Sequence, residues 1–355
     1  MKISTIKLQE MVDKVKVGIG NNKLIPITQY IQISVNDNIL DLLTTDGRSY
    51  VSVETDVISD DFTVVVDADM FVSLINKITV ETVIMEMNEN CLKITGNGSY
   101  KLDIKLDENG TNLRFPEDEL FKLDLSQLNC ERINKDTINQ VLNINKPALA
   151  TTLELPCYTG YYFGDNIIAT DTMKICALNK KVFNVPMLIS GDVLELLKVV
   201  SEDVNVFITP EGIVWDANDV TIYSKPFEGI ETFAIDAITN YLSQNMDNVC
   251  ELQAKQFLSA LDRLSLFVSP YDKNIVDLHF MSSEVSIESK QSNGVETLSY
   301  LDVDEHKTFD CHIDIEMLSS QIRALPEDTF KLYYGDNRCI KIECGDVTQI
   351  ICLAE

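Results

Sequence analysis

The stretch Asp69-Met-Phe-Val-Ser-Leu-Ile-Asn-Lys-Ile78, followed by Val83-Ile-Met-Glu-Met87, decides the fold because its pattern occurs three times. The first segment has apolar residues at helical spacing, an acidic residue at its start and Lys77 near its end, as helices favour. The second segment has the composition of a strand. Matching pairs of segments lie at 192–200 with 204–208 and at 316–325 with 330–334. A helix followed by strands is therefore predicted at three evenly spaced places.

A further helix precedes each of these segments. Leu8, Met11, Val12 and Val15 form an apolar stripe with i, i+3, i+4, i+7 spacing, and similar stripes lie within 134–146 and 253–264. The repeat predicts three similar domains, 1–120, 121–244 and 245–355. Each is expected to be an α+β domain in which two helices pack on an antiparallel sheet. Stacking such units edge to edge and closing them into a ring would leave no sheet edge free.

The composition is that of a globular, strongly acidic protein. The 355 residues are 45% hydrophobic, and 29 Lys+Arg against 56 Asp+Glu give a net charge of −27. The chain has no run of 18 apolar residues, so we expect no membrane span. The start, Met1-Lys2-Ile3-Ser4, lacks the apolar stretch and cleavage site of a secretory signal, so we expect a cytoplasmic protein.

No motif of a catalytic or metal site is present in the sequence. Nine scattered cysteines without a C-x-x-C pair are expected to be reduced and mostly buried. His279, His306 and His312 are too few and too far apart for ordinary zinc spacing. There is no phosphate-binding glycine loop, nucleophile elbow or H-E-x-x-H sequence. We therefore expect no catalytic residue, metal or cofactor, and acidic runs such as Glu117-Asp118-Glu119 are interpreted as solvated loops.

The acidic charge avoids the predicted helices. The six helical segments, 5–16, 69–78, 134–146, 191–200, 253–264 and 316–325, sum to +2, so the rest of the chain carries −29. Helix surfaces usually mix signs, which gives this split an ordinary alternative explanation. The functional interpretation is a helix-lined surface that tolerates phosphate within a body that repels it. The helix-borne candidates for contact with a nucleic-acid backbone are Lys14, Lys77, Asn139, Asn143, Lys146, Lys198, Arg263 and Arg323.

Two short stretches carry a resemblance to a known family. Asn166-Ile-Ile-Ala-Thr-Asp-Thr-Met-Lys-Ile-Cys-Ala177 resembles the second-domain strand of the bacterial β sliding clamp, which reads Ala-Thr-Asp-Gly-His-Arg-Leu-Ala. Leu24-Ile-Pro26-Ile27 is similar to the Leu-Pro-Ile that follows the first helix of such clamps, with Lys23 in the place of a basic loop residue. The resemblance adds Lys23 to the residues that we expect to contact DNA. Thr172 replaces the usual glycine, which is the kind of change expected of a divergent member, for instance one encoded by a bacteriophage.

The resemblance implies a non-catalytic processivity factor of DNA replication, a subunit of the DNA polymerase III type. Family members are rings of six units that encircle duplex DNA without reading sequence, so three DNA-clamp domains per chain imply a head-to-tail homodimer. Because such a ring holds DNA by enclosure, weak phosphate contacts are sufficient. The implied partners are double-stranded DNA, the replicative DNA polymerase and the clamp loader.

The resemblance also implies a peptide-binding pocket for the polymerase and the loader. Its residues would be Thr170, Thr172, Lys174, Ile175, Tyr241, Leu242, Ile350, Ile351, Cys352 and Leu353. An ordinary core strand is the competing interpretation for Ile350 and Ile351. Two other functions remain open from the sequence: an acidic DNA mimic that inhibits a replication enzyme, and a hydrolase that uses paired carboxylates.

Overall fold

The computed structural model describes residues 1–20, 22–152, 154–268, 274–289, 293–302, 307–335 and 338–354. Its contacts divide the chain into two compact units. The first consists of Met1–Ile138 with Asp192–Pro226, and the second of Asn139–Gly191 with Phe227–Glu355. Both units consist of antiparallel strands and a few short helices, so the predicted α+β class is confirmed.

One motif, a strand, a helix and three further strands, recurs six times along the chain. The first two copies are β1 (Lys2–Ser4), α1 (Thr5–Val15), β2 (Tyr30–Asn36), β3 (Ile39–Thr45), β4 (Ser49–Asp56), and β5 (Phe62–Asp67), α2 (Ala68–Ile75), β6 (Thr82–Met87), β7 (Cys91–Thr95), β8 (Ser99–Asp103). The next two are β9 (Cys130–Ile133), α3 (Lys135–Gln140), β10 (Gly160–Phe163), β11 (Ile167–Thr170), β12 (Lys174–Leu178), and β13 (Met187–Ser190), α4 (Gly191–Leu196), β14 (Val204–Ile208), β15 (Ile213–Ala217), β16 (Val220–Ser224).

The last two copies follow a connecting helix, α5 (Ile235–Leu242). They are β17 (Asn248–Gln253), α6 (Ala254–Leu264), β18 (Ile275–Phe280), β19 (Glu284–Ser289), β20 (Val295–Ser299), and β21 (Phe309–Asp314), α7 (Ile315–Arg323), β22 (Thr329–Tyr334), β23 (Cys339–Cys344), β24 (Val347–Cys352). The six helices predicted from the apolar stripes are thus all present. The sequence analysis missed α5.

The strands form two sheets of eight and two sheets of four. The eight-stranded sheets have the orders β5-β2-β3-β4-β16-β15-β14-β9 and β13-β10-β11-β12-β24-β23-β22-β17. Each therefore joins two groups of four strands from distant parts of the chain, at the antiparallel pairs β4–β16 (the first junction) and β12–β24 (the second junction). The four-stranded sheets, β1-β6-β7-β8 and β20-β19-β18-β21, are built like single halves of these.

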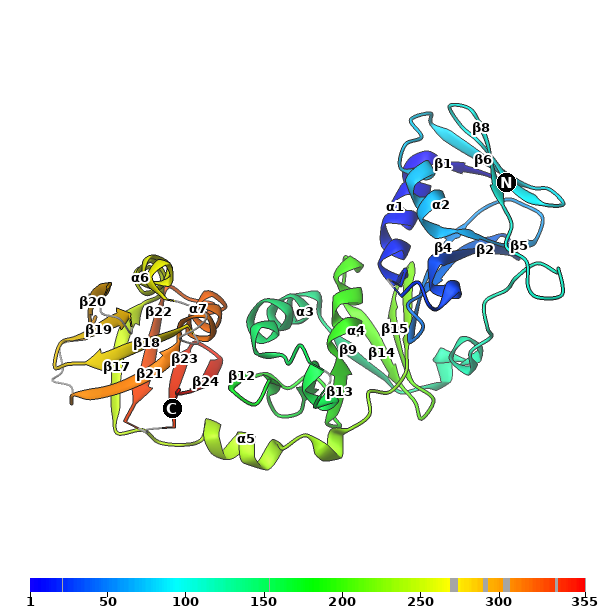
Figure 1. The fold of residues 1–355 in the computed structure, drawn as a ribbon. Helices are drawn as coiled ribbons and strands as arrows, with labels where there is room; N and C mark the ends of the chain where they lie inside the picture. Colours follow the sequence, from blue (N-terminus) through cyan, green and yellow to red (C-terminus); the bar gives the residue numbers. More distant parts are fainter. Residues whose placement is uncertain are drawn as a thin grey trace. The chain divides into compact units, whose positions relative to one another are not determined.

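Each helix buries the apolar stripe that predicted it. Leu8, Met11, Val12 and Val15 of α1 are buried, and α6 buries Phe257, Ala260, Leu261 and Leu264 in the same order. The helices lie side by side in pairs, α1 with α2 and α6 with α7 (Figure 1). Asp67 and Asp314 cap α2 and α7 by accepting hydrogen bonds from backbone amides of the first turn.

No helix in the part of the chain that the structure describes is both long and apolar enough to traverse a bilayer. All nine cysteines are free thiols, and most are buried, as predicted. His279 and His312 lie on β18 and β21 and bind Asp310 and Asp277 across the strand pair, whereas His306 is outside the described residues. Within the described ranges, no group of three or more His, Cys, Asp or Glu side chains is arranged to hold a metal ion.

Candidate functional site

The predicted peptide-site residues meet where β12 pairs with β24. Lys174 and Ile175 lie opposite Ile351 and Ile350 in the strand register. The backbone amide of Cys352 donates to the carbonyl of Met173 at 2.8 Å, and the amide of Leu353 donates to the carbonyl of Arg338 at the same distance. The end of the chain is thereby held beside the turn that contains Thr172.

The two faces of this strand pair differ. Ile175, Ile350 and Leu242 of α5 belong to one apolar cluster, which also contains Phe233 and Ile238 from the connecting segment. Ile351 points to the opposite face and is fully buried in the core under α6 and α7, where Leu353 also packs. The core-strand interpretation therefore holds for Ile351. Ile350 is also buried, at 2% exposure, but on the face that α5 covers.

Apolar side chains near this cluster are open to solvent. Met173, in the turn before β12, is 46% exposed, Tyr241 of α5 is 37% exposed, and Leu155 is 50% exposed. Met173 and Leu155 were missed by the sequence analysis, although Met173 lies within the quoted stretch. Their exposure beside a buried apolar cluster makes them candidates for contact with a partner.

Hydrogen bonds fix the turn between β11 and β12. The Thr170 hydroxyl is buried and donates to the carbonyl of Lys174 at 2.8 Å, while it accepts from the amide of Thr172 at 3.1 Å. The Asp171 carboxylate accepts from the amides of Met173 and Lys174 and forms an ion pair with the Lys174 ammonium at 3.4 Å. Thr170 and Lys174 therefore shape the turn, and Thr172 has a φ of 79°.

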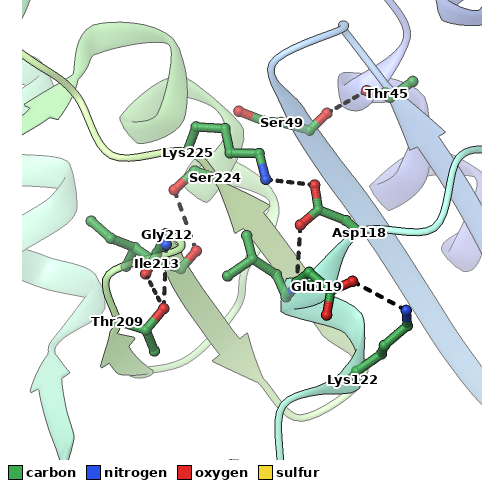
Figure 2. A network of polar contacts seen from close by, with 11 residues as sticks. Thr45, Ser49, Asp118, Glu119, Lys122, Thr209, Gly212, Ile213, Ser224 and Lys225 are labelled. Atoms are coloured by element: carbon green, nitrogen blue, oxygen red, sulfur yellow. Dashed lines mark hydrogen bonds and ion pairs between the residues drawn. The ribbon is translucent and has the colours of Figure 1, made fainter.

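The same turn occurs beside the first junction, between β3 and β4. Figure 2 shows the Thr45 hydroxyl bonded to the Ser49 carbonyl there, at 2.7 Å. The amides of Arg48 and Ser49 donate to Asp46 as those of Met173 and Lys174 do to Asp171. The glycine that the second turn lacks is present here as Gly47, with a φ of 92°.

The acidic run 117–119 belongs to the segment that covers the first junction. Phe121 packs edge-on between Tyr50 of β4 and Tyr223 of β16, with ring centroids 5.0 and 4.7 Å away. Asp118 binds Lys225 at 2.6 Å, as Figure 2 shows, and caps the amide of Leu120. Partial burial by itself would raise the pKa of the Asp118 carboxyl. The hydrogen bonds from Lys225 and from the Leu120 amide outweigh it, so this pKa is lowered.

The predicted nucleic-acid contacts divide into two groups. Lys14, Lys198, Arg263 and Arg323 each form an ion pair with Asp219, Glu195, Glu296 and Asp262 respectively. Lys23, Lys77, Asn139, Asn143 and Lys146 are exposed on helices or on the loops beside them. The ion-paired group has part of its charge neutralised locally, which the sequence analysis did not predict because most of the acidic partners are remote in the sequence.

Comparison with known proteins agrees with this fold. Residues 1–110 match the family model described as DNA polymerase III beta subunit, N-terminal domain. The beta sliding clamp of Bacillus subtilis (strain 168) is 24% identical over 311 residues, which cover 78% of this chain and 77% of that protein.

Solved structures match over the whole length. The crystal structure of the DNA polymerase sliding clamp from Bacillus subtilis has a TM-score of 0.86 and 20% identity, and the match covers 100% of this chain and 98% of that one. The beta subunit from DNA polymerase of Streptococcus pyogenes gives a TM-score of 0.85 at 17% identity, with coverage of 100% and 99%.

The six repeated motifs and the paired half-sheets are thus the fold of the sliding clamps. The resemblance to the bacterial DNA polymerase III β subunit that the sequence analysis identified is confirmed: its family model matches residues 1–110, and the clamp fold extends over the whole chain.

Proposed function

We propose that this chain is a DNA sliding clamp, a non-catalytic processivity factor that encircles duplex DNA and tethers a replicative polymerase. The three domains of one chain, 1–120, 121–244 and 245–355, form half of a ring, and two chains joined head to tail form the whole. The protein acts in the cytoplasm, where bacterial-type replication takes place. The clamp fold and the match to the β-subunit family model support this function.

The observation that carries the proposal is that β8 and β20 are edge strands of the two four-stranded sheets. Inside the chain, the last strand of one domain pairs with the middle of the domain before it, as β16 with β4 and β24 with β12. By the same rule β8, the last strand of the first domain, needs a partner equivalent to β4 and β12. That strand is β20, which lies at the edge of the other four-stranded sheet. Pairing β8 of one chain with β20 of a second leaves both edges covered.

Apolar residues beside these edges support the pairing. Leu266 and Phe267, in a short 3-10 turn after α6, are 80% and 50% exposed, and Phe267 lies against Gly294, the residue before β20. Leu106, just after β8, is 56% exposed. Large apolar side chains at an open sheet edge are costly in water and are typical of an interface between subunits.

The candidate peptide site is the place where the polymerase and the clamp loader attach. Thr170, Thr172, Lys174 and Ile175 from β11, β12 and their turn, Tyr241 and Leu242 of α5, and Ile350 and Cys352 of β24 would receive an extended peptide with apolar side chains, whereas Ile351 and Leu353 pack into the core on the opposite face. The exposed polar residues, Lys23, Lys77, Asn139, Asn143 and Lys146, would contact DNA phosphates weakly, without reading sequence.

The solution mass of the purified protein tests this function. The monomer mass is 40.0 kDa, and the proposal requires the mass of two chains by sedimentation equilibrium at micromolar concentration. A particle that stays monomeric at that concentration would contradict it. That result would favour the acidic DNA mimic, which needs only one chain and competes with DNA for its target.

A further inference from the structure

Arg263 of α6 occupies the same position in its repeat as Lys14 of α1. The buried stripe Leu8, Met11, Val12, Val15 corresponds to Phe257, Ala260, Leu261, Leu264, and each cation stands directly before the last buried residue. An aspartate, Asp13 or Asp262, precedes each cation. The two cations nevertheless bind acids in different places.

Lys14 reaches across the first junction. Its ammonium lies 3.1 and 2.9 Å from the carboxylate oxygens of Asp219, in the turn between β15 and β16. The carbonyl of Asp219 in turn accepts the amide of Glu54 on β4 at 3.0 Å. The lysine therefore fastens the turn of one repeat onto the edge strand of another. At the second junction the carbonyl of Asp346, in the equivalent turn, accepts the amide of Asn179 at 2.8 Å.

Arg263 binds its own sheet instead. Its Nε and Nη2 donate to the two carboxylate oxygens of Glu296, on β20, at 2.6 and 2.7 Å. This is the two-point geometry in which guanidinium–carboxylate pairs are strongest. A groove of about 380 Å³, lined among others by Lys255, Ser259, Arg263, Glu296 and Leu298, lies beside the pair.

Glu296 stands where the internal junctions have an aliphatic residue. The strand pairs β3–β4, β11–β12 and β19–β20 are equivalent. At the same position in these pairs, Val53 lies opposite Leu42, Leu178 lies opposite Ile167, and Glu296 lies opposite Ile287. Val53 and Leu178 are buried and pair with Val220 and Val347 across the two junctions. An unpaired glutamate at such a position would be costly to cover, so the arginine is needed to neutralise it.

The edge at β8, which would pair with β20, also differs from the strands at the two internal junctions. The turn before β8 is Gly96-Asn97-Gly98, which has no carboxylate to bind a cation. Asn97 is already engaged, since its side chain accepts from the Thr79 amide and donates to the Thr79 hydroxyl, both at 2.8 Å. Gly98, whose carbonyl pairs with the amide of Gly96, takes the place of Val220. In place of a valine side chain, the tip of the Tyr100 ring lies against Gly98.

We propose that the Arg263–Glu296 pair is the positioning element of the subunit seam: it holds the edge of β20 ready for β8 of a second copy, with Glu296 facing Gly98 of the partner subunit. This rests on the proposed dimer. Arg263, which the charge distribution suggested as a DNA contact, then acts on ring closure through Glu296 and not on phosphate.

The test compares two arginines of the same domain. Arg263→Ala and Arg323→Ala each remove one helix-borne cation that is paired with an acid, but Arg323 pairs with Asp262 of α6 and not with β20. The dimer dissociation constant of full-length protein is measured by sedimentation equilibrium or mass photometry. We expect Arg263→Ala to raise it at least tenfold and Arg323→Ala to change it less than twofold. Arg263→Lys should restore only part of the affinity, because lysine cannot make the two-point contact.

A second variant keeps the inference testable if Arg263→Ala unfolds. Glu296→Gln removes the charge but keeps the shape, and should also weaken the dimer, while the double variant should be no weaker than Arg263→Ala alone. Equal dissociation constants for wild type, Arg263→Ala and Glu296→Gln, in proteins with unchanged thermal unfolding, would overturn the inference but leave the clamp intact. A wild-type protein that is monomeric at all concentrations would instead overturn the proposed function.

Discussion

Thr172 has the left-handed backbone conformation of Gly47, with a φ of 79° against 92°, in the second of two matching turns. The turns at 45–49 and 170–174 make the same five hydrogen bonds, two of them to an aspartate carboxylate. A β-branched residue rarely adopts this conformation, because its Cβ approaches the following carbonyl. The hydrogen bonds of the turn impose the conformation on Thr172, at a cost in strain.

Replacing Thr172 with glycine should therefore stabilise the protein. The left-handed conformation costs a residue with a side chain about 1–2 kcal/mol, of which the greater flexibility of glycine in the unfolded chain offsets a part. We expect Thr172→Gly to raise the free energy of unfolding by about 1 kcal/mol in urea denaturation. The matched exchange, Gly47→Thr, should lower it by about the same amount, since space around Gly47 is adequate and only the backbone conformation is unfavourable. A lower stability of Thr172→Gly would contradict this interpretation.

Changes at the exposed rim of the candidate peptide site should weaken partner binding without unfolding the chain. Met173→Glu and Tyr241→Ala alter side chains that are more than one third exposed. We expect each to weaken binding of the polymerase by at least tenfold in surface plasmon resonance, because a bound peptide would meet a charge or have no apolar side chain to pack against. Leu24→Glu, at an apolar residue that is 90% exposed in the first unit, is the matched control and should bind normally. Normal binding by all three variants would remove the β12–β24 junction as the site.

The exposed lysines predict a salt-dependent contact with DNA. In Lys23→Ala/Lys77→Ala/Lys146→Ala protein, the slope of log affinity against log salt should become shallower by up to about 0.9 for each phosphate that is no longer neutralised. The slope is measured by fluorescence anisotropy with a labelled duplex. Lys122→Ala removes a lysine that binds Glu117 and Glu119 in the segment over the first junction, and should leave the slope unchanged. Identical slopes for wild type and the triple variant would show that these lysines do not face DNA.

A partly buried carboxyl, that of Asp41, predicts a pH dependence of stability. Burial raises the pKa of Asp41 to about 7, with the Ser52 hydrogen bond opposing and the Glu54 charge adding to the effect. Because the folded protein binds this proton more tightly than the unfolded chain does, the stabilisation is complete below the ordinary pKa of 3.8 and is lost as the pH rises through about 7. Between pH 5 and 8 the unfolding temperature of wild type should fall more steeply than that of Asp41→Asn. Parallel profiles, with exposed Asp60→Asn as the control, would contradict the assignment.

Periodicity in the sequence was enough to predict the six helices of the repeats and the fold class. Buried stripes such as Leu8, Met11, Val12 and Val15 are a local property of one helix, so local spacing identifies them. The connecting helix α5 was missed because it lies outside the repeated pattern and its N-cap residue, Ala234, makes no side-chain cap. Neither the β4–β16 nor the β12–β24 pairing could be predicted, because each joins strands more than 150 residues apart in the sequence.

The candidate sites were only partly predictable for the same reason. Residues 170–175 and 350–353 were grouped through the family resemblance, and the β12–β24 register brings them together. The face on which each side chain lies depends on that register, which separates Ile350 from Ile351. Arg263 was predicted from its charge and its place on a helix, but its partner Glu296 is on a strand 33 residues away. Ion pairs of this kind depend on tertiary structure and have no local sequence signal.

Retention on circular DNA tests the central claim most directly. Wild-type protein is loaded onto a nicked circular duplex, isolated by gel filtration, and followed before and after a single cut that makes the DNA linear. A clamp held by enclosure should stay on the circle in salt that abolishes ordinary phosphate contacts and should leave quickly once the DNA has ends. Loss from the intact circle at the same rate as from the linear duplex would contradict the account.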